Sequence, residues 1–478
     1  MPTAPLPSDP SLEWLRNRAR DVQRRDGVRL SDAQLSVARE YGFASWPKLR
    51  AHVELVRELS RAPEAAAPSD DAPTEFLRLA CLAYGGDDGP ERWATADAVL
   101  AAHPSLPSSS VHVAAAAADI DTVRAWLARD QRLASAPGGP HGWVPLLYLA
   151  YARISAAADE ERVLACVHAL LGAGADPNAG YLWHGLPSPF TVVTGALGEG
   201  EQGPLRQPRH PHDVAVARAL LDAGADANDS QALYNRMFGA DDSHLELLFA
   251  YGLGTGDGGP WRARLGHVVG SPPEQLRYQL AWATQRGTAA RVRLLVEHGV
   301  DVQTPFADGT TPVERAARRG DADLVDILVA AGAHRPSLAP ADALVAAVLG
   351  EDDDAAAGLL ATDDGLVAAA RAAHPWAVLE ATTARRLRAV RRLVELGFDV
   401  NAAIPAGHGR VAGMTALHEA VSGDLALVRL LLELGADPDI RDAEFYATPL
   451  GWAEHGYAHE AAAVLRPVTA ASEQTVDP

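Results

Sequence analysis

Lysine and cysteine are scarce in this sequence, and long apolar runs are absent. Lys48 is the only lysine among 478 residues, and 42 Lys+Arg stand against 62 Asp+Glu, which gives a formal net charge of −20. A surface of this charge repels phosphate backbones and anionic lipids, so we expect neither nucleic acid nor a membrane as a partner. The preference for arginine over lysine, together with many alanines, indicates a GC-rich bacterial coding bias.

The two cysteines and the N-terminal residues predict the compartment. Cys81 and Cys166 lie in apolar helical patterns, so we expect buried, reduced thiols, which suit the cytosol. The first ten residues lack both the basic and the apolar region of a secretory signal peptide. No stretch of about 18 consecutive apolar residues is present to span a membrane. We therefore expect a soluble, cytoplasmic protein.

The stretch from Met414 to Asp439 predicts a complete unit of two helices and a turn. Residues 415–418, Thr-Ala-Leu-His, open a short helix that continues through Val421 and is broken by Ser-Gly-Asp at 422–424. A second helix, rich in leucine, runs from Leu425 to Leu434, and a glycine that can take a positive φ follows it. A helix pair this small cannot bury its apolar faces alone, so we expect copies of the unit to stack.

The same pattern recurs along most of the chain. Gly299 and Gly332 close two neighbouring units and lie 33 residues apart. Spacings of this kind predict about ten to eleven helix pairs. The closing Gly-Ala-Asp or a variant of it occurs at residues 174–176, 224–226, 299–301, 332–334, 397–399 and 435–437.

These units are similar to the ankyrin repeat. The resemblance lies in a Thr-Pro-Leu start, a Gly-Asp or Gly-Tyr break, an apolar second helix and the closing Gly-Ala-Asp. It is specific at residues 311–334, 415–439 and 448–465 and weak at 74–134 and 339–383. It implies an all-α ankyrin-repeat solenoid, in which finger loops and first helices line a concave face used mostly for protein binding.

The sequence predicts five segments and three insertions. AREYGFASWPKLRAHVE, at residues 38–54, resembles a segment that precedes repeats in many bacterial ankyrin-type proteins. We expect a disordered N-terminus at 1–10, a helical module at 11–60, a linker at 61–73, the repeat solenoid at 74–466 and a polar tail at 467–478. The insertions lie at 177–213, 252–273 and 402–413.

Reactive side chains within the repeats have structural interpretations. In ankyrin repeats the histidine at the position of His418 ties neighbouring finger loops together by hydrogen bonds, so we favour this role over catalysis. Asp176, Asp226, Asp399 and Asp437 follow the closing glycines, where aspartate side chains bond nearby backbone. We therefore expect these groups to stabilise turns.

The insertion at 177–213 departs furthest from the repeat. It carries Tyr181, Trp183, His184 and Phe190, and so many aromatic residues argue against disorder. Loops of this length are usually functional. We expect a folded flap over part of the concave face.

Two chemical alternatives for this insertion have weak support. The Gly-Glu-Gly-Glu run at 198–201 lacks the Lys-Ser/Thr that follows a phosphate-binding loop. Glu199, Glu201, His210 and His212 include a His-Pro-His spacing, which is weak evidence for a metal site. We therefore predict neither a metal nor a cofactor.

The other two insertions hold fewer informative residues. Trp261, Arg262 and Arg264 either pack against the adjacent helix pair or project into the groove, and packing is favoured. His408 and Arg410 lie in a glycine-rich frame that predicts a mobile finger.

Alignment with the unit at 414–439 predicts which side chains face the groove. Trp, Tyr and Arg are frequent among them, which is typical of binding hot spots, although any one tryptophan could instead seal a gap between units. With the aromatic residues of the first insertion, the predicted partner- or ligand-binding residues are Tyr151, Tyr181, Trp183, His184, Asn235, Trp282, Gln285, Arg315, Arg318, Glu419, Trp452 and His455.

The sequence favours a binding protein over an enzyme. Gly-x-Ser-x-Gly, His-Glu-x-x-His and Cys-x-x-Cys are absent, so we predict no catalytic residue. His184 with Tyr181, or His455 with Glu454, could serve acid–base chemistry only within one pocket. We expect a scaffold or regulator that binds a partner protein through its concave face. The alternative is an enzyme or small-molecule binder whose groove pocket is covered by the 177–213 insertion. The oligomeric state does not follow from the sequence.

Overall fold

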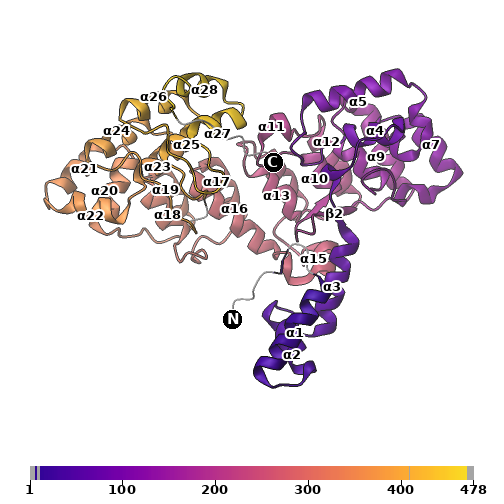
Figure 1. Cartoon of the computed structure of the whole chain (residues 1–478), viewed down its shortest axis with the longest axis horizontal. Helices are drawn as coiled ribbons and strands as arrows, with labels where there is room; N and C mark the ends of the chain where they lie inside the picture. The colour runs from indigo at the N-terminus through magenta and orange to yellow at the C-terminus, as the bar shows by residue number, and fades with distance from the viewer. Residues whose placement is uncertain (1–5, 8–10, 408–409, 471–478) are drawn as a thin grey trace. The chain divides into compact units, whose positions relative to one another are not determined.

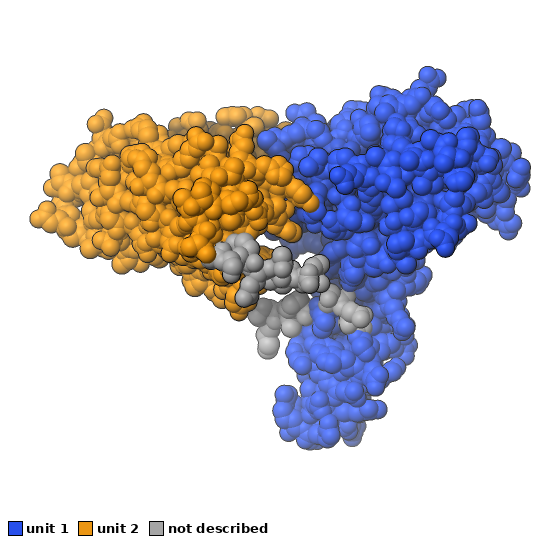
Figure 2. Space-filling model, turned by 45° about the horizontal axis from the view of Figure 1, so that its top comes forward, with its two compact units in different colours: residues 1–279 blue, residues 280–478 orange. Residues whose placement is uncertain are grey.

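The computed structural model describes residues 6–7, 11–407 and 410–470, and most of them are helical, in agreement with the all-α class. The chain divides into two compact units, residues 1–279 and residues 280–478 (Figure 2), and the boundary falls within helix α16 (Pro272–Arg286). The predictions for His408, for residues 471–478 of the tail and for most of residues 1–10 lie outside the described residues.

Three helices open unit 1: α1 (Leu12–Asp26), α2 (Leu30–Glu40) and α3 (Trp46–Leu59). Ser45 begins α3 as its N-cap, because its side chain accepts from the backbone of Lys48 at 3.4 Å. The buried faces of the three helices meet around Leu15, Val37 and Leu49, which form a small core of their own. Residues 61–73, predicted as a linker, include the end of strand β1 (Ser60–Arg61) and a 3-10 turn, η1 (Pro63–Ala65).

Stacked helix pairs make up the rest of unit 1. First helices contact first helices, in the order α4, α6, α8, α10 and α13, and second helices α7, α9, α12 and α14 contact one another in the same way. The pairs are α4 (Ala72–Ala80) with α5 (Pro90–Ala102), α6 (Val111–Ala116) with α7 (Ile120–Arg129), α8 (Pro145–Tyr151) with α9 (Glu160–Gly172), α10 (Val192–Leu197) with α12 (Asp213–Asp222), and α13 (Ser230–Arg236) with α14 (Ser243–Ala250). Short elements connect them: η2 (Leu106–Ser109), η3 (Gln131–Ser135), η4 (Ser155–Ala158) and α11 (Gly203–Arg206).

The first part of the 177–213 insertion forms a hairpin that the sequence analysis did not predict. Strand β2 (Gly180–Trp183) pairs antiparallel with β3 (Pro189–Thr191), and β1 pairs parallel with β2. The three strands are too short for the alternation that identifies a strand from sequence. Their pairing joins the end of α3 to a segment about 120 residues later in the chain.

The 252–273 insertion packs against the N-terminal helices of unit 1. It contains α15 (Gly259–Leu265) and η5 (Gly266–Val268), and α15 lies beside α3 (Figure 1). Trp261 is buried with Val56 and Leu182, and its indole nitrogen donates to the carbonyl of Asn178 at 2.9 Å. Trp261 is therefore a packing residue, as predicted, but it packs on α3 and β2 and not on the adjacent helix pair.

Unit 2 repeats the same arrangement of helix pairs, and the buried residues between Leu344 and Leu465 form one continuous core within it. After the second half of α16 and α17 (Ala289–Glu297) come α18 (Pro312–Arg318) with α19 (Ala322–Ala330), α20 (Pro340–Leu349) with α21 (Asp353–Leu360), the single helix α22 (Leu366–Ala373), α23 (Ala377–Thr383) with α24 (Leu387–Glu395), α25 (Ala416–Ala420) with α26 (Leu425–Glu433), and α27 (Pro449–His455) with α28 (His459–Leu465).

The turns that close the helix pairs use one hydrogen-bond pattern. Asp399 and Asp437 each accept from the backbone nitrogen two residues later at 2.9 Å, and Asp176 and Asp226 do the same at 2.8 and 3.1 Å. The turn role predicted for all four is confirmed. The asparagine side chains in these turns reach the turn of the next helix pair. Asn401, for example, accepts from Asp437 N at 2.8 Å. Polar groups of one turn thus find hydrogen-bond partners in the turn of the neighbouring helix pair.

His418 joins two neighbouring helix pairs of unit 2, as predicted. Its Nδ1 contacts the backbone nitrogen of Thr415 at 3.2 Å, and its Nε2 contacts the carbonyl of Ala447 at 3.2 Å. The ring is fully buried and packs edge-on against Trp452. The described contacts explain this histidine structurally.

Candidate functional site

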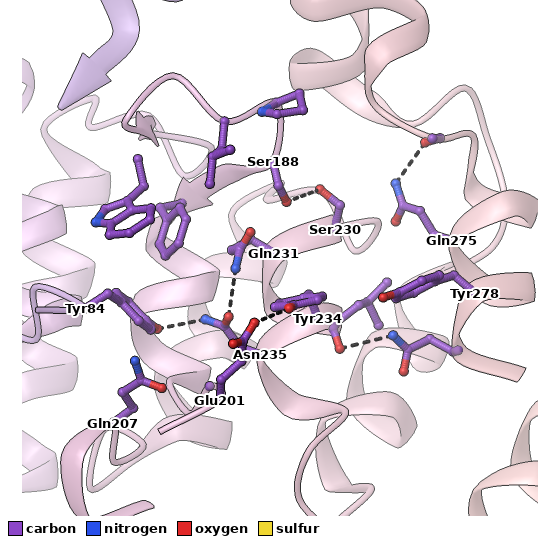
Figure 3. A pocket seen from close by; sticks show the side chains of 18 of the residues that line it. Tyr84, Ser188, Glu201, Gln207, Ser230, Gln231, Tyr234, Asn235, Gln275 and Tyr278 are labelled. Carbon is purple, nitrogen blue, oxygen red and sulfur yellow. Dashed lines mark hydrogen bonds between the residues drawn. The ribbon is translucent and has the colours of Figure 1, made fainter. Parts of the chain in front are cut away.

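Unit 1 holds a pocket of about 590 Å³, which we call the unit 1 pocket (Figure 3). Four segments and one isolated residue, Tyr84, surround it: the β2–β3 hairpin, residues 200–207, α13, and residues 270–279 at the start of α16. Its volume lies within the range of small-molecule sites. The 177–213 insertion therefore forms a large part of its wall.

The buried side chain of Arg153 anchors the second part of that insertion. Its Nε donates to the carbonyl of Pro208 at 2.8 Å, and its Nη2 donates to the carbonyl of Gly195 at 2.7 Å. Its Nη1 donates to the carbonyls of Ala150 and Ala152, both at 3.0 Å. These bonds fix the segment that leads into the pocket wall.

Asp229 fixes α13 against β3 and α10. Its carboxylate accepts from the Thr191 hydroxyl, from the Thr194 hydroxyl at 3.0 Å, and from the backbone of Ala232 at 2.9 Å. Burial raises the pKa of Asp229, although these three donors oppose the shift. The N-cap of α13 thus positions the face that lines the pocket.

A chain of hydrogen bonds crosses one wall of the pocket (Figure 3). Gln231 Nε2 donates to Asn235 Oδ1 at 2.7 Å, and Asn235 Nδ2 donates to Tyr84 Oη at 2.8 Å. Asn235 is 2% exposed. The Tyr84 ring packs edge-on against Phe190 at 5.0 Å, and burial raises the pKa of its phenol. Tyr84 thereby remains a neutral hydroxyl at the pocket wall.

Two glutamines of α16 form the opposite wall. Gln275 Nε2 donates to the carbonyl of Gly270 at 3.0 Å, and Gln279 Nε2 donates to the carbonyl of Leu233 at 3.1 Å. Gln275 is 8% exposed and Gln279 is 1% exposed. The Oε1 atoms of both are buried and accept no hydrogen bond from any residue that the structure describes.

The pocket carries negative charge and aromatic surface. Glu201 and Glu274 are its charged residues, and its lining contains no arginine, lysine or histidine. The Tyr234 hydroxyl donates to Glu201, and burial together with this carboxylate raises the pKa of Tyr234. Burial, and then Glu201, raise the pKa of Tyr278. Both phenols therefore stay uncharged at neutral pH.

Two of the sequence-predicted residues line the pocket and three in the same unit do not. Trp183 and Asn235 belong to its lining. Tyr151 and Tyr181 are buried, and Tyr181 stacks behind the pocket on Phe190 at 5.6 Å.

His184 is exposed and contacts Glu64, which also accepts from the Trp183 indole at 3.0 Å. Both His184 and Tyr181 lie outside the lining, so they do not meet in the unit 1 pocket for acid–base chemistry.

The remaining predicted residues belong to unit 2, where several make hydrogen bonds, ion pairs or ring contacts with nearby residues. Arg315 donates to the carbonyl of Ala281 at 3.0 Å and to Asp308 at 2.7 Å. Trp452 donates to Asp442 at 2.9 Å, Glu419 pairs with Arg410 at 3.1 Å, and Trp282 lies against the Arg286 guanidinium at 4.7 Å. The exposed members are Gln285, Arg318 and His455. Glu454, the suggested partner of His455, pairs with Arg466 at 2.6 Å.

The two glutamates considered for a metal site contact different partners, and the backbone nitrogen of His212 donates to Nδ1 of His210 at 3.1 Å. Glu199 pairs with Arg209 and Arg236, whereas Glu201 accepts from Tyr234. His212 contacts the carbonyl of Ala158. Among residues 6–7, 11–407 and 410–470, no group of three or more His, Cys, Asp or Glu is arranged to hold a metal ion. In the same part of the chain, each helix is too short or too polar to cross a membrane.

Most of the pocket lining was missed by the sequence analysis. Gln231 with Asn235, and Gln275 with Gln279, are amide pairs at i, i+4 spacing, which places both members on one helix face. This spacing was the available signal. Tyr84 follows α4 in a weakly matching unit, where the repeat pattern assigns it no role.

One comparison with known proteins gave a match. Residues 412–443, which contain α25, α26 and the turn after them, match the family model of the ankyrin repeat. A comparison with curated proteins gave no match. The family match supports an ankyrin-repeat protein and indicates a role in protein–protein interaction. The unit 1 pocket lies outside the matched residues.

Proposed function

We propose that this chain is a non-enzymatic scaffold or regulator that holds a segment of a partner protein in the unit 1 pocket. The composition of the pocket lining carries this proposal. Tyr84, Trp183, Phe190, Tyr234 and Tyr278 supply aromatic surface, which binding hot spots favour. The ankyrin repeat in unit 2 adds support, because it indicates protein–protein interaction.

The lining favours binding over catalysis. Its two serines, Ser188 and Ser230, bond each other at 3.1 Å, and no histidine lies within the lining to activate either hydroxyl. Glu201 is engaged by Tyr234. Such a site can orient a ligand, but it offers no nucleophile paired with a base.

A small-molecule binder is the second candidate. The observation that favours it is the pocket volume of about 590 Å³, which is typical of small-molecule sites. We keep the groove residues of unit 2 as a proposed further contact surface, with Gln285, Arg318 and His455 as its exposed members.

Partner binding by two tyrosine variants tests the proposed function. Tyr278 is 51% exposed at the pocket, and Tyr446, which belongs to unit 2 and is not a lining residue, is 66% exposed. A partner is identified by affinity capture and purified, and its affinity is then measured for Tyr278→Ala and Tyr446→Ala. We expect Tyr278→Ala alone to weaken binding, by about tenfold or more. Equal affinity of both variants and the unchanged chain would contradict the proposal.

A further inference from the structure

The amide groups of the unit 1 pocket have their donors committed and their acceptors available. Gln275 and Gln279 each direct Nε2 at a backbone carbonyl, of Gly270 and Leu233 respectively. A carbonyl only accepts, so each nitrogen must face it and each Oε1 must face the other way. Both Oε1 atoms are buried, and they accept no hydrogen bond from the described residues.

A buried acceptor without a donor is costly, because it has given up its hydrogen bonds to water. Two such acceptors line the same pocket, on α16 side chains that are 8% and 1% exposed. The stable arrangement is therefore one in which a group from outside donates to them. A ligand that carries hydrogen-bond donors is therefore favoured at this wall.

The charges of the pocket restrict the chemical class of the ligand further, to a cation. The carboxylates of Glu201 and Glu274 line it without an arginine, lysine or histidine among the lining residues. Tyr234 and Tyr278 add aromatic faces, which attract cations through the ring quadrupole. The chain's formal charge of −20 also draws cations toward it.

We infer that the unit 1 pocket binds an organic cation on a flexible chain, an alkylammonium or a guanidinium group. Both are donor-only groups, so they satisfy the Gln275 and Gln279 oxygens while pairing with a carboxylate. This inference rests on the proposed function, in which the cation is a lysine or arginine side chain of the partner protein. A free organic amine offers the same chemistry.

Calorimetric titration of the full chain tests this inference. The probes are the capped tripeptide Gly-Arg-Gly, the same peptide with neutral citrulline in place of arginine, and 1,5-diaminopentane. We expect the arginine peptide to bind at least about tenfold more tightly than the citrulline peptide, because only it is charged. Binding should also weaken as the salt concentration rises.

Matched variants locate the binding. Glu201→Gln removes one charge from the pocket and keeps the shape of the side chain. Glu246→Gln removes the charge of another exposed glutamate, on α14 and outside the lining. Glu201→Gln should weaken binding of the arginine peptide about tenfold, and Glu246→Gln should leave it unchanged. Equal binding of both peptides, equal effects of both variants, or no binding of any cation overturns the inference.

The outcomes separate this inference from the proposed function. If partner binding depends on Tyr278 while no cationic probe binds, the inference fails and the proposed function stands. If Glu201→Gln weakens binding of 1,5-diaminopentane while Tyr278→Ala leaves the affinity for the partner unchanged, the cation inference stands. The proposed partner role then fails in favour of a small-molecule binder.

Discussion

The side-chain amide of Asn235 donates a hydrogen bond to the phenol oxygen of Tyr84 at 2.8 Å, across 151 positions of sequence. The bond joins α13 to the loop after α4, so it links the beginning and the end of the stacked pairs in unit 1. Both residues are buried at the wall of the unit 1 pocket. The shape of the pocket therefore depends on contacts between distant segments.

Replacing Asn235 with leucine should destabilise unit 1. The change removes the partner of the Gln231 amide and of the Tyr84 hydroxyl, both of which are buried. We expect a loss of about 1–3 kcal/mol in the free energy of unfolding, measured by urea denaturation. Gln285→Leu, at an exposed position, is the control and should stay within about 0.5 kcal/mol. Equal stability of the two variants would show that the network contributes nothing.

Replacing Arg153 with methionine should release the second part of the 177–213 insertion. Four backbone carbonyls, including those of Pro208 and Gly195, would lose a buried donor. We expect a loss of about 3 kcal/mol or more, with faster proteolytic cleavage within residues 198–212. Arg124→Met, at an exposed position of α7, is the matched control. An unchanged cleavage rate in Arg153→Met would contradict the anchoring role.

His141, a buried residue between η3 and α8, should make the protein less stable in acid. Burial, with a smaller contribution from Arg92, lowers the pKa of His141 from its ordinary 6.5 to about 3. Below pH 6.5 the unfolded chain binds a proton that the folded chain excludes, so stability falls as pH falls. The contribution of this residue is about 1.4 kcal/mol for each pH unit between about 6.5 and 3.

The variant His141→Phe isolates this effect. Unfolding curves at several pH values are compared for the variant and the unchanged chain, since all other titrating groups are common to both. The difference in unfolding free energy should change steadily in the variant's favour below pH 6.5. A difference that is constant across this window would rule out the assigned role.

His418→Leu tests the interpretation of the repeat histidine. The substitution removes the contacts to Thr415 and to the carbonyl of Ala447, so we expect unit 2 to lose about 1–3 kcal/mol of stability. Binding of the arginine peptide should be unchanged, because the pocket belongs to unit 1. His455→Leu is the exposed control. A loss of peptide binding without a loss of stability would point to a functional histidine instead.

The sequence was most informative where the pattern of two helices and a closing turn repeats. The aspartates of the closing turns and His418 have roles set by local geometry that recurs at each unit, so the pattern predicts them. Trp261 was also interpreted correctly as a packing residue. The aspartates and His418 act within their own helix pair or on the next one, whereas Trp261 bonds Asn178, 83 residues away.

The pocket could be predicted only in part. The 177–213 insertion was identified as the place to look, and Trp183 and Asn235 do line the unit 1 pocket. Tyr84 could not be found in this way, because its role depends on a partner 151 residues away in the sequence. The β1–β2 pairing was missed for the same reason. Contacts of this range are fixed by the packing of the whole unit.

A crystal structure of the full chain with the capped Gly-Arg-Gly peptide tests the central claim most directly. The account predicts the guanidinium in the unit 1 pocket, with a nitrogen about 2.7–3.2 Å from Oε1 of Gln275 or Gln279 and a second contact to Glu201 or Glu274. A guanidinium bound elsewhere on the chain, with the two glutamine oxygens untouched, would contradict it.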